Sequence, residues 1–229
     1  MVTVRARRTP VGVFRRKPPV ARSRYRRVAG TSVLALALSA ALPGAAAHAA
    51  FPGIKAYLVR SGEMPGFVVK GAPEFATGAT PWVTRVEDET GSRARRDTQT
   101  LRSAGFVAGA YENLRPKNGS SDGAGGSTVL QFKTPSEARK FVAKQYAEGL
   151  ALQPEGAIIH PLKLAIKGGR GFTAPGSGAE PAGASNAYFS SGRCLFVVGD
   201  FIDGRKPNTG SPVAVAAKRV DKRVGGACR

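Results

Sequence analysis

Residues 128–149 read TVLQFKTPSEARKFVAKQYAEG, and this stretch decides the fold. Its β-branched and apolar beginning, 128–132, predicts a strand. The motif 134–137, TPSE, then predicts the start of a helix, because the threonine caps it, the proline suits its first turn and the glutamate completes a capping box. Apolar residues continue at helical spacing up to Gly149, at Ala138, Phe141 and Val142. The stretch therefore predicts a strand followed by an amphipathic helix.

Upstream of this stretch, the sequence predicts another helix and another strand. Thr90 or Ser92 is placed to cap a helix, and Gly105 follows as the glycine that ends it. Residues 106–114 then predict a strand. The glycine- and serine-rich residues 118–126 predict a loop that leads into the next strand.

The same order of elements returns towards the end of the chain. Residues 186–202 predict a hairpin, and Ser211-Pro212 predicts the start of a last helix. Two strands and a capped helix therefore occur at 105–149 and again at 184–225. We expect an α+β domain, an antiparallel sheet of hairpins with two or three helices packed on one face. A duplicated β-β-α unit is one interpretation of the repeat; the other is that a hairpin followed by a helix is a common unit.

The first 49 residues have the three parts of a secretory signal peptide. A basic stretch ends at Arg27, an apolar run covers 28–42, and small residues lead to the cleavage motif Ala47-His48-Ala49. The apolar run is short for a membrane span. We therefore expect cleavage near Ala49-Ala50 and a secreted, extracytoplasmic domain that meets the membrane only during export. An uncleaved anchor is the alternative, and both the Sec and the twin-arginine routes stay open.

The remaining residues are enough for one hydrophobic core. We expect residues 50–90 to form an N-terminal segment that packs on the domain, and 91–229 to form the α+β domain itself. Within the first segment, residues 67–70 predict a short strand and 71–81 predict a loop. Trp82 is expected to anchor a small satellite cluster.

The strong positive charge of the chain belongs largely to the predicted signal. Ten of the 35 basic residues lie within residues 1–27, which contain no acidic residue. Removal of the signal therefore lowers the formal net charge from +20 to about +10. A basic chain of this kind otherwise suggests nucleic-acid binding. Because half of the charge leaves with the signal, we expect no nucleic-acid partner.

The two cysteines of the chain, Cys194 and Cys228, both follow the predicted signal. Outside the cytoplasm such a pair normally forms a disulfide. The strand that begins at Cys194 leads away, and the helix that begins near Ser211 leads back over a similar distance, so Cys228 returns close to Cys194. We expect a Cys194–Cys228 disulfide that stabilises the domain by about 3–4 kcal/mol.

Two groups of basic residues are candidates for ligand binding. Lys167 and Arg170 flank a glycine-rich loop, whose backbone and two cations suit an anion. A second group, Arg93, Arg95 and Arg96, lies on the helix predicted after Thr90. The partner expected from these cations is an acidic envelope polymer or a lipid headgroup. The alternative interpretation is a solvated basic face without a ligand.

The other candidates for chemistry are few. The acidic run Glu87-Asp88-Glu89 precedes a predicted helix, where negative charge favours the helix N-terminus, and calcium binding is the alternative. His160 is the one histidine after the signal, and no Gly-x-Ser-x-Gly motif provides it with a nucleophile. We expect no catalytic residue, no metal site and no cofactor.

Three features resemble a known group of proteins: the segment Phe132–Ala138, the strand pair around Cys194, and the export signal. Together they are similar to small exported domains of actinobacteria, which include lipoproteins and kinase sensor domains with a PsbP-like α/β sandwich. The resemblance implies a ligand-binding or accessory role and supplies no catalytic residues. The chain lacks the lipobox of the lipoproteins and the kinase of the sensors.

The sequence therefore predicts an exported, non-enzymatic binding or accessory domain of the bacterial cell envelope. A secreted hydrolase that uses His160 and a purely structural envelope protein are the alternatives. A cleft that joins His160 to a serine and a carboxylate favours the hydrolase, whereas a large apolar cavity under the sheet favours a binding protein.

Overall fold

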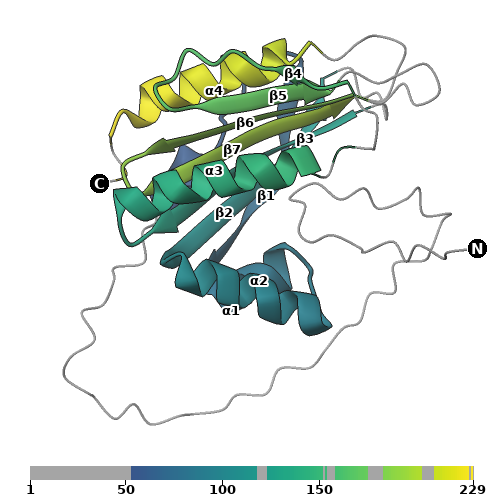
Figure 1. Ribbon diagram of the computed structural model, residues 1–229. Helices are drawn as coiled ribbons and strands as arrows, with labels where there is room; N and C mark the ends of the chain where they lie inside the picture. Colours follow the sequence, from purple (N-terminus) through teal and green to yellow (C-terminus); the bar gives the residue numbers. More distant parts are fainter. Residues whose placement is uncertain are drawn as a thin grey trace, which may run out of the picture. The chain divides into compact units, whose positions relative to one another are not determined.

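The structure is a computed structural model, which describes residues 53–117, 123–151, 153, 158–174, 183–202, 209–226 and 228. The predicted export signal, residues 1–49, lies outside the described residues. A seven-stranded sheet with the order β1-β2-β3-β7-β6-β5-β4 dominates the described part (Figure 1). Neighbouring strands pair antiparallel throughout this sheet, and helices pack against it. The α+β class predicted from the sequence is therefore confirmed.

The elements have the following bounds. The strands are β1 (Phe67–Thr77), β2 (Phe106–Pro116), β3 (Gly123–Phe132), β4 (His160–Pro161), β5 (Arg170–Ala174), β6 (Gly183–Ser191) and β7 (Cys194–Ile202). The helices are the 3-10 turn η1 (Ile54–Tyr57), the short α1 (Ala79–Pro81), the π-helical turn η2 (Trp82–Val86), α2 (Gly91–Ser103), α3 (Pro135–Ala151) and α4 (Ser211–Val224). Among the described residues, no helix has the length and apolar character that a membrane crossing requires.

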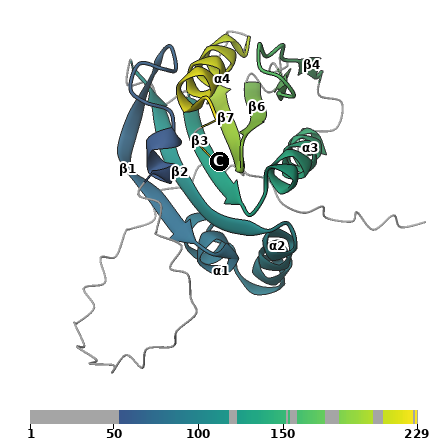
Figure 2. The same cartoon turned by 90° about the vertical axis from the view of Figure 1, so that its left-hand side faces the viewer.

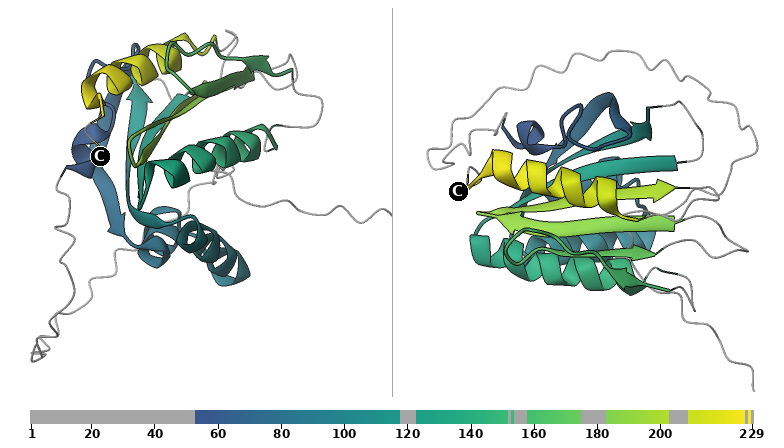
Figure 3. Two further views of the ribbon diagram at one scale, coloured as in Figure 1. Left: turned by 60° about the vertical axis from the view of Figure 1, so that its left-hand side comes forward. Right: turned by 90° about the horizontal axis from the view of Figure 1, so that it is seen from above.

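The helices lie on both faces of the sheet, which corrects the expectation of helices on one face. Phe196 of β7 belongs to the core that α4 covers, whereas its neighbours Leu195 and Val197 belong to the core covered by α2 and α3. Figures 2 and 3 show α4 on one side of the sheet and α3 on the other. Successive side chains of a strand point to opposite faces. Because the run 194–198 is apolar throughout, both faces of this central strand need a helical cover.

The two predicted β-β-α units do not occupy equivalent places. α4 packs on β6 and β7, the hairpin that precedes it. α3 packs on the opposite face across β6, β7, β5 and β3, mostly outside its own hairpin. The structure therefore gives the duplication no support, and hairpin plus helix serves here as a common unit.

The predicted start of α3 is confirmed. The backbone N–H of Thr134 donates to the carboxylate of Glu137 at 2.8 Å, and the N–H of Glu137 donates to the Thr134 hydroxyl at 3.2 Å. These two bonds form the capping box. The buried face of α3 follows the predicted spacing, with Ala138, Phe141, Val142 and Gln145.

The end of α2 and the start of α3 meet at Gly105. This residue has a φ of 76°, in the left-handed region that favours glycine, as predicted for the residue that ends α2. Its carbonyl accepts a hydrogen bond from the N–H of Lys133 at 2.9 Å. A Cβ at position 105 would overlap the carboxylate of Glu137. Glycine at this position therefore lets the capping glutamate of α3 sit against the end of α2, which fixes the two helices relative to each other.

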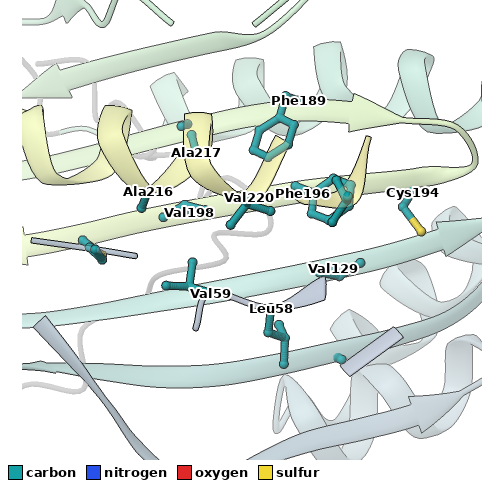
Figure 4. Packing of buried hydrophobic residues seen from close by; sticks show 14 of the residues in the cluster. Leu58, Val59, Val129, Phe189, Cys194, Phe196, Val198, Ala216, Ala217 and Val220 are labelled. Atoms are coloured by element: carbon teal, nitrogen blue, oxygen red, sulfur yellow. The ribbon is translucent and has the colours of Figure 1, made fainter. Parts of the chain in front are cut away.

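α4 covers the other face of the sheet. Its buried side chains are Val213, Ala216, Ala217, Val220 and Val224. Figure 4 shows Ala216, Ala217 and Val220 over the aromatic and aliphatic side chains of β6 and β7, among them Phe189, Phe196 and Val198. The rings of Phe189 and Phe196 stack with centroids 4.9 Å apart.

The predicted disulfide is confirmed. Cys194 and Cys228 are bonded, with their Cα atoms 5.8 Å apart. The carbonyl of Cys228 also accepts a hydrogen bond from the N–H of Arg193 at 2.6 Å, and the N–H of Gly226 donates to the hydroxyl of Ser191 at 3.1 Å. The segment after α4 is thus joined to the β6–β7 turn. A disulfide of this kind is typical of proteins outside the reducing cytoplasm.

Two segments that the sequence predicts as loops form strands instead. β1 continues through residues 71–77, and β3 begins at Gly123, inside the predicted loop 118–126, of which residues 118–122 lie outside the described part. A Cβ at Gly125 would lie 3.1 Å from the carbonyl oxygen of Gly199 and 3.2 Å from the Cβ of Leu114. The glycines here mark a close approach of neighbouring strands and not a turn.

Candidate functional site

The candidate functional site is a cavity of about 320 Å³ between α2 and α3. Its floor is the sheet, through Thr128 and Leu130 of β3 and Val197 of β7. α2 and α3 provide the walls, and Trp82 and Glu87 complete the lining. Figure 2 shows the two helices on the same side of the sheet. Small-molecule sites have volumes of roughly 300–1,000 Å³, so this cavity suits a small ligand.

Asp97 is the acidic residue on the α2 wall. The buried face of α2 consists of Ala94, Asp97, Thr98 and Leu101, which are spaced as one side of a helix. Asp97 is 6% exposed, and its Oδ2 accepts no hydrogen bond. Its ion-pair partner, the Nε of Arg93, is 3.6 Å away, which is too long for a hydrogen bond. A buried carboxylate oxygen without a hydrogen bond costs stability, so this wall holds an unsatisfied acceptor.

Glu87 and Trp82 form a second polar contact at the cavity. The indole N–H of Trp82 donates to Oε1 of Glu87 at 2.8 Å. Burial raises the pKa of Glu87 to about 7; the hydrogen bond from Trp82 opposes this rise, and the negative charges of Asp97 and Glu89 add to it. Trp82 itself is 3% exposed and belongs to the core under α2 and α3. The expectation that Trp82 anchors a small satellite cluster is therefore wrong.

The α3 wall carries Glu148, Gln145 and Lys144. The side-chain amide of Gln145 donates to Oε2 of Glu148 at 2.8 Å, and the Nζ of Lys144 lies 3.9 Å from Oε1. Burial raises the pKa of Glu148; the positive charge of Lys144 opposes the rise and the negative charge of Asp97 adds to it. The carboxylates of the two walls therefore influence each other across the cavity.

The charged residues of the lining differ in their exposure to solvent. Lys144 is exposed, with 42% of its side chain accessible, and Arg96 is exposed as well. Asp97 is buried, and Glu87 and Glu148 are half-buried. The two cations of the lining are therefore more exposed to solvent than its three carboxylates.

The predicted basic residues of α2 have three different surroundings. Arg93 pairs with carboxylates, through Nη2 to Oε1 of Glu89 at 3.0 Å and through Nε to Oδ2 of Asp97 at 3.6 Å. Arg96 lines the cavity, whereas Arg95 is exposed and does not line it.

The other predicted cations lie elsewhere. Lys167 is exposed in the segment before β5, and Arg170 begins β5, with its guanidinium 5.7 Å from the centre of the Tyr146 ring. β5 is four places away from β2, the strand against which α2 packs. The structure thus does not bring Lys167 and Arg170 together with the arginines of α2. Binding of either group to an acidic polymer or a lipid headgroup stays a prediction.

His160 lies away from the cavity. It is exposed in the edge strand β4, opposite Thr173 of β5, and it is not part of the cavity lining. Among the described residues, no group of three or more histidine, cysteine, aspartate or glutamate side chains is placed to hold a metal ion.

Sequence reasoning missed the acidic lining of the cavity. It assigned Glu87 to the start of α2, and it did not single out Asp97 or Glu148. One local signal was available: Asp97 stands between Ala94 and Leu101 at helical spacing, so it occupies a core-facing position of α2. An acidic residue at such a position indicates either an internal partner or a ligand.

Comparison with known proteins gives a weak structural similarity. No protein-family model matches the chain, and no curated protein matches it. Among solved structures, the chain is similar to the extracellular domain of PknH from Mycobacterium tuberculosis, with 16% sequence identity and a TM-score of 0.49. The match covers 74% of this chain and 94% of that domain. At this level of similarity the match assigns neither a family nor a function.

Proposed function

We propose that this chain is an exported, non-enzymatic binding domain whose ligand site is the cavity between α2 and α3. The observation that carries the proposal is a cavity whose lining combines apolar side chains, such as those of Leu130 and Val197, with the buried carboxylate of Asp97, whose ion-pair partner Arg93 is 3.6 Å away. Small-molecule sites usually have this form, a concave and mostly apolar surface with a few polar groups that orient the ligand.

The location outside the cytoplasm is supported by two features of the chain. The signal-like residues 1–49 have the order of charge, apolar run and small residues that export requires. The Cys194–Cys228 disulfide is of the kind that persists in an oxidising environment.

The two alternatives have less support. A hydrolase that uses His160 needs this side chain in a cleft, and His160 is exposed in β4 outside the cavity lining. A purely structural protein gains nothing from a buried carboxylate such as Asp97 whose ion-pair partner is 3.6 Å away, because a poorly paired buried charge costs stability. A binding protein accepts this cost because a ligand with a hydrogen-bond donor can pair with the carboxylate.

The chain offers a direct readout for a test. Trp82 is its one tryptophan and lines the cavity. We expect the neutral apolar fluorophore 1-N-phenylnaphthylamine to bind saturably to the purified protein and to quench Trp82 by energy transfer. Thr100→Phe places a ring in the cavity from the α2 wall, and we expect it to weaken binding at least tenfold.

The matched control is Gln99→Phe, which adds the same ring to the exposed side of the same helix. We expect this variant to bind the fluorophore like the parent protein. Absence of saturable quenching, or equal binding by the Thr100→Phe and Gln99→Phe variants, would contradict the proposed site.

A further inference from the structure

We propose that the ligand of this cavity carries a protonated amine joined to a small apolar or aromatic body, and that Asp97 binds the amine. This inference rests on the proposed function, because it assigns a chemical class to the ligand of the same site. It starts from the oxygen that the protein leaves without a hydrogen bond.

The negative charge of Asp97 is only partly compensated by the neighbouring cation of the protein. Its ion-pair partner Arg93 is shared, because the guanidinium lies closer to Glu89, at 3.0 Å, than to Asp97, at 3.6 Å. The Nε of Arg93 and the Oδ2 of Asp97 are both buried, and neither makes a hydrogen bond. An ammonium group in the cavity that donates to the carboxylate of Asp97 would form the short, charge-assisted bond that Arg93, at 3.6 Å, does not form.

The remaining charges of the cavity favour the same class of ligand. Three carboxyl groups belong to the lining, from Glu87, Asp97 and Glu148. The negative charge of Asp97 acts on both of the others. The two cations of the lining, Arg96 and Lys144, are exposed and therefore screened by water. A cation inside the cavity would relieve the repulsion among the carboxylates, whereas an anion would increase it.

The apolar side chains of the lining indicate the chemical nature of the rest of the ligand. Leu101, Leu130 and Val197 form an aliphatic surface, and Trp82 and Phe141 add two aromatic rings. All five side chains are buried. An apolar or aromatic body would cover this surface, and the aromatic rings would also attract the ammonium through cation–π interaction. Phe141 already holds such a cation, since the Nζ of Lys144 lies 5.5 Å from the centre of its ring.

The test uses three small molecules that share a phenyl ring and differ at the end of the side chain: phenethylamine, 2-phenylethanol and 3-phenylpropionate. Each displaces 1-N-phenylnaphthylamine from the purified protein at pH 8, where the amine is protonated. We expect phenethylamine to bind at least tenfold more tightly than the alcohol, and the carboxylate to bind most weakly.

Asp97→Asn separates the charge from the shape of the site. We expect this variant to bind phenethylamine at least tenfold more weakly and to bind 2-phenylethanol as the parent does. Glu74→Gln is the matched control, because it removes the same charge from the exposed surface of β1, outside the cavity lining, and we expect it to bind both molecules as the parent does. If the Asp97→Asn variant does not fold by circular dichroism, Glu148→Gln takes its place, with a smaller expected loss of the preference for the amine.

The outcomes distinguish the two proposals. Equal affinity for the three molecules, or tightest binding of the carboxylate, overturns the amine inference and leaves the proposed binding site intact. The same conclusion follows if Ca²⁺ or Mg²⁺ displaces the fluorophore from the parent but not from the Asp97→Asn variant, because the carboxylates then serve a metal ion. If the fluorophore itself does not bind saturably, the proposed function and the amine inference fail together.

Discussion

At the scale of single residues, Glu112 of β2 is a carboxyl group held in the core that α4 covers. It is 6% exposed, and its Oε1 has no hydrogen-bond partner. Burial raises the pKa of Glu112 to about 7; the negative charge of Glu63 adds to the rise and Arg223 opposes it. The folded state therefore holds a proton on Glu112 at pH values where the unfolded chain, with an ordinary carboxyl pKa, has released it. Folding stability falls as the pH rises through this window, from about 4.5 to 7.

Glu112→Gln is therefore expected to stabilise the protein at alkaline pH. The amide is neutral at every pH, so the variant avoids the cost of an ionised buried carboxylate. We expect the free energy of unfolding to rise by on the order of 2 kcal/mol at pH 8 and to change little at pH 5, as measured by urea unfolding at both pH values. Glu74→Gln, on the exposed surface of β1, is the control for a change of net charge. An equal effect of Glu112→Gln at pH 5 and pH 8 would show that ionisation of Glu112 is not responsible.

At the scale of elements, local sequence signals predict well where a helix begins and ends. They predict poorly which face of the sheet the helix covers. The capping motif at 134–137 and the apolar spacing of α3 and α4 depend only on nearby residues, and both helices are confirmed. The face of the sheet that each helix covers depends on where its connections lead, which no local pattern records. Local patterns do not predict the cavity either, because it depends on the distance between α2 and α3. Asp97 alone had a local signal, its core-facing position on α2.

The capping box of α3 is a test of how much such a local signal contributes. Thr134→Ala removes the hydroxyl that accepts from the N–H of Glu137. We expect the free energy of unfolding to fall by about 0.5–2 kcal/mol, measured by urea unfolding at pH 7. Thr134→Ser keeps the hydroxyl and serves as the control, with most of the stability retained. A loss of the same size in the Thr134→Ser variant would mean that the methyl group, and not the cap, is responsible.

At the scale of the whole molecule, residues 54–64 form a strap that joins the beginning of the described chain to α4. Arg223 of α4 donates to Oε1 of Glu63 at 2.7 Å and to the carbonyl oxygens of Ala56 and Leu58 at 2.6 and 2.7 Å. Arg219 donates to the carbonyl oxygen of Gly62 at 2.6 Å. The strap also buries four apolar side chains in the core, those of Ile54, Leu58, Val59 and Met64. Two segments about 160 residues apart are thus held together by one arginine-centred network and one core.

Because the strap is bound to α4 largely through Arg223, we expect substitution of this residue to lower the stability strongly. Burial alone would raise the pKa of Glu63, but hydrogen bonds and positive charge from Arg223, together with Arg60, hold it below its ordinary value. Arg223→Ala leaves the carboxylates of Glu63 and Glu112 without this cation and frees the carbonyl groups of the strap. We expect the free energy of unfolding to fall by on the order of 2–3 kcal/mol at pH 7. Lys222→Ala, at the exposed neighbouring position, is expected to stay within about 0.5 kcal/mol of the parent.

The pH dependence of this loss identifies its source. Because the folded-state pKa of Glu63 lies below the ordinary carboxyl value, the stability that its ionised form contributes is present above that value and is lost as the pH falls through the folded pKa. The difference between the Arg223→Ala variant and the parent should therefore shrink when urea unfolding is repeated near pH 3. A difference that stays constant with pH would assign the effect to the carbonyl groups of Ala56 and Leu58. A loss no larger than that of Lys222→Ala would show that the strap is held by its apolar side chains alone.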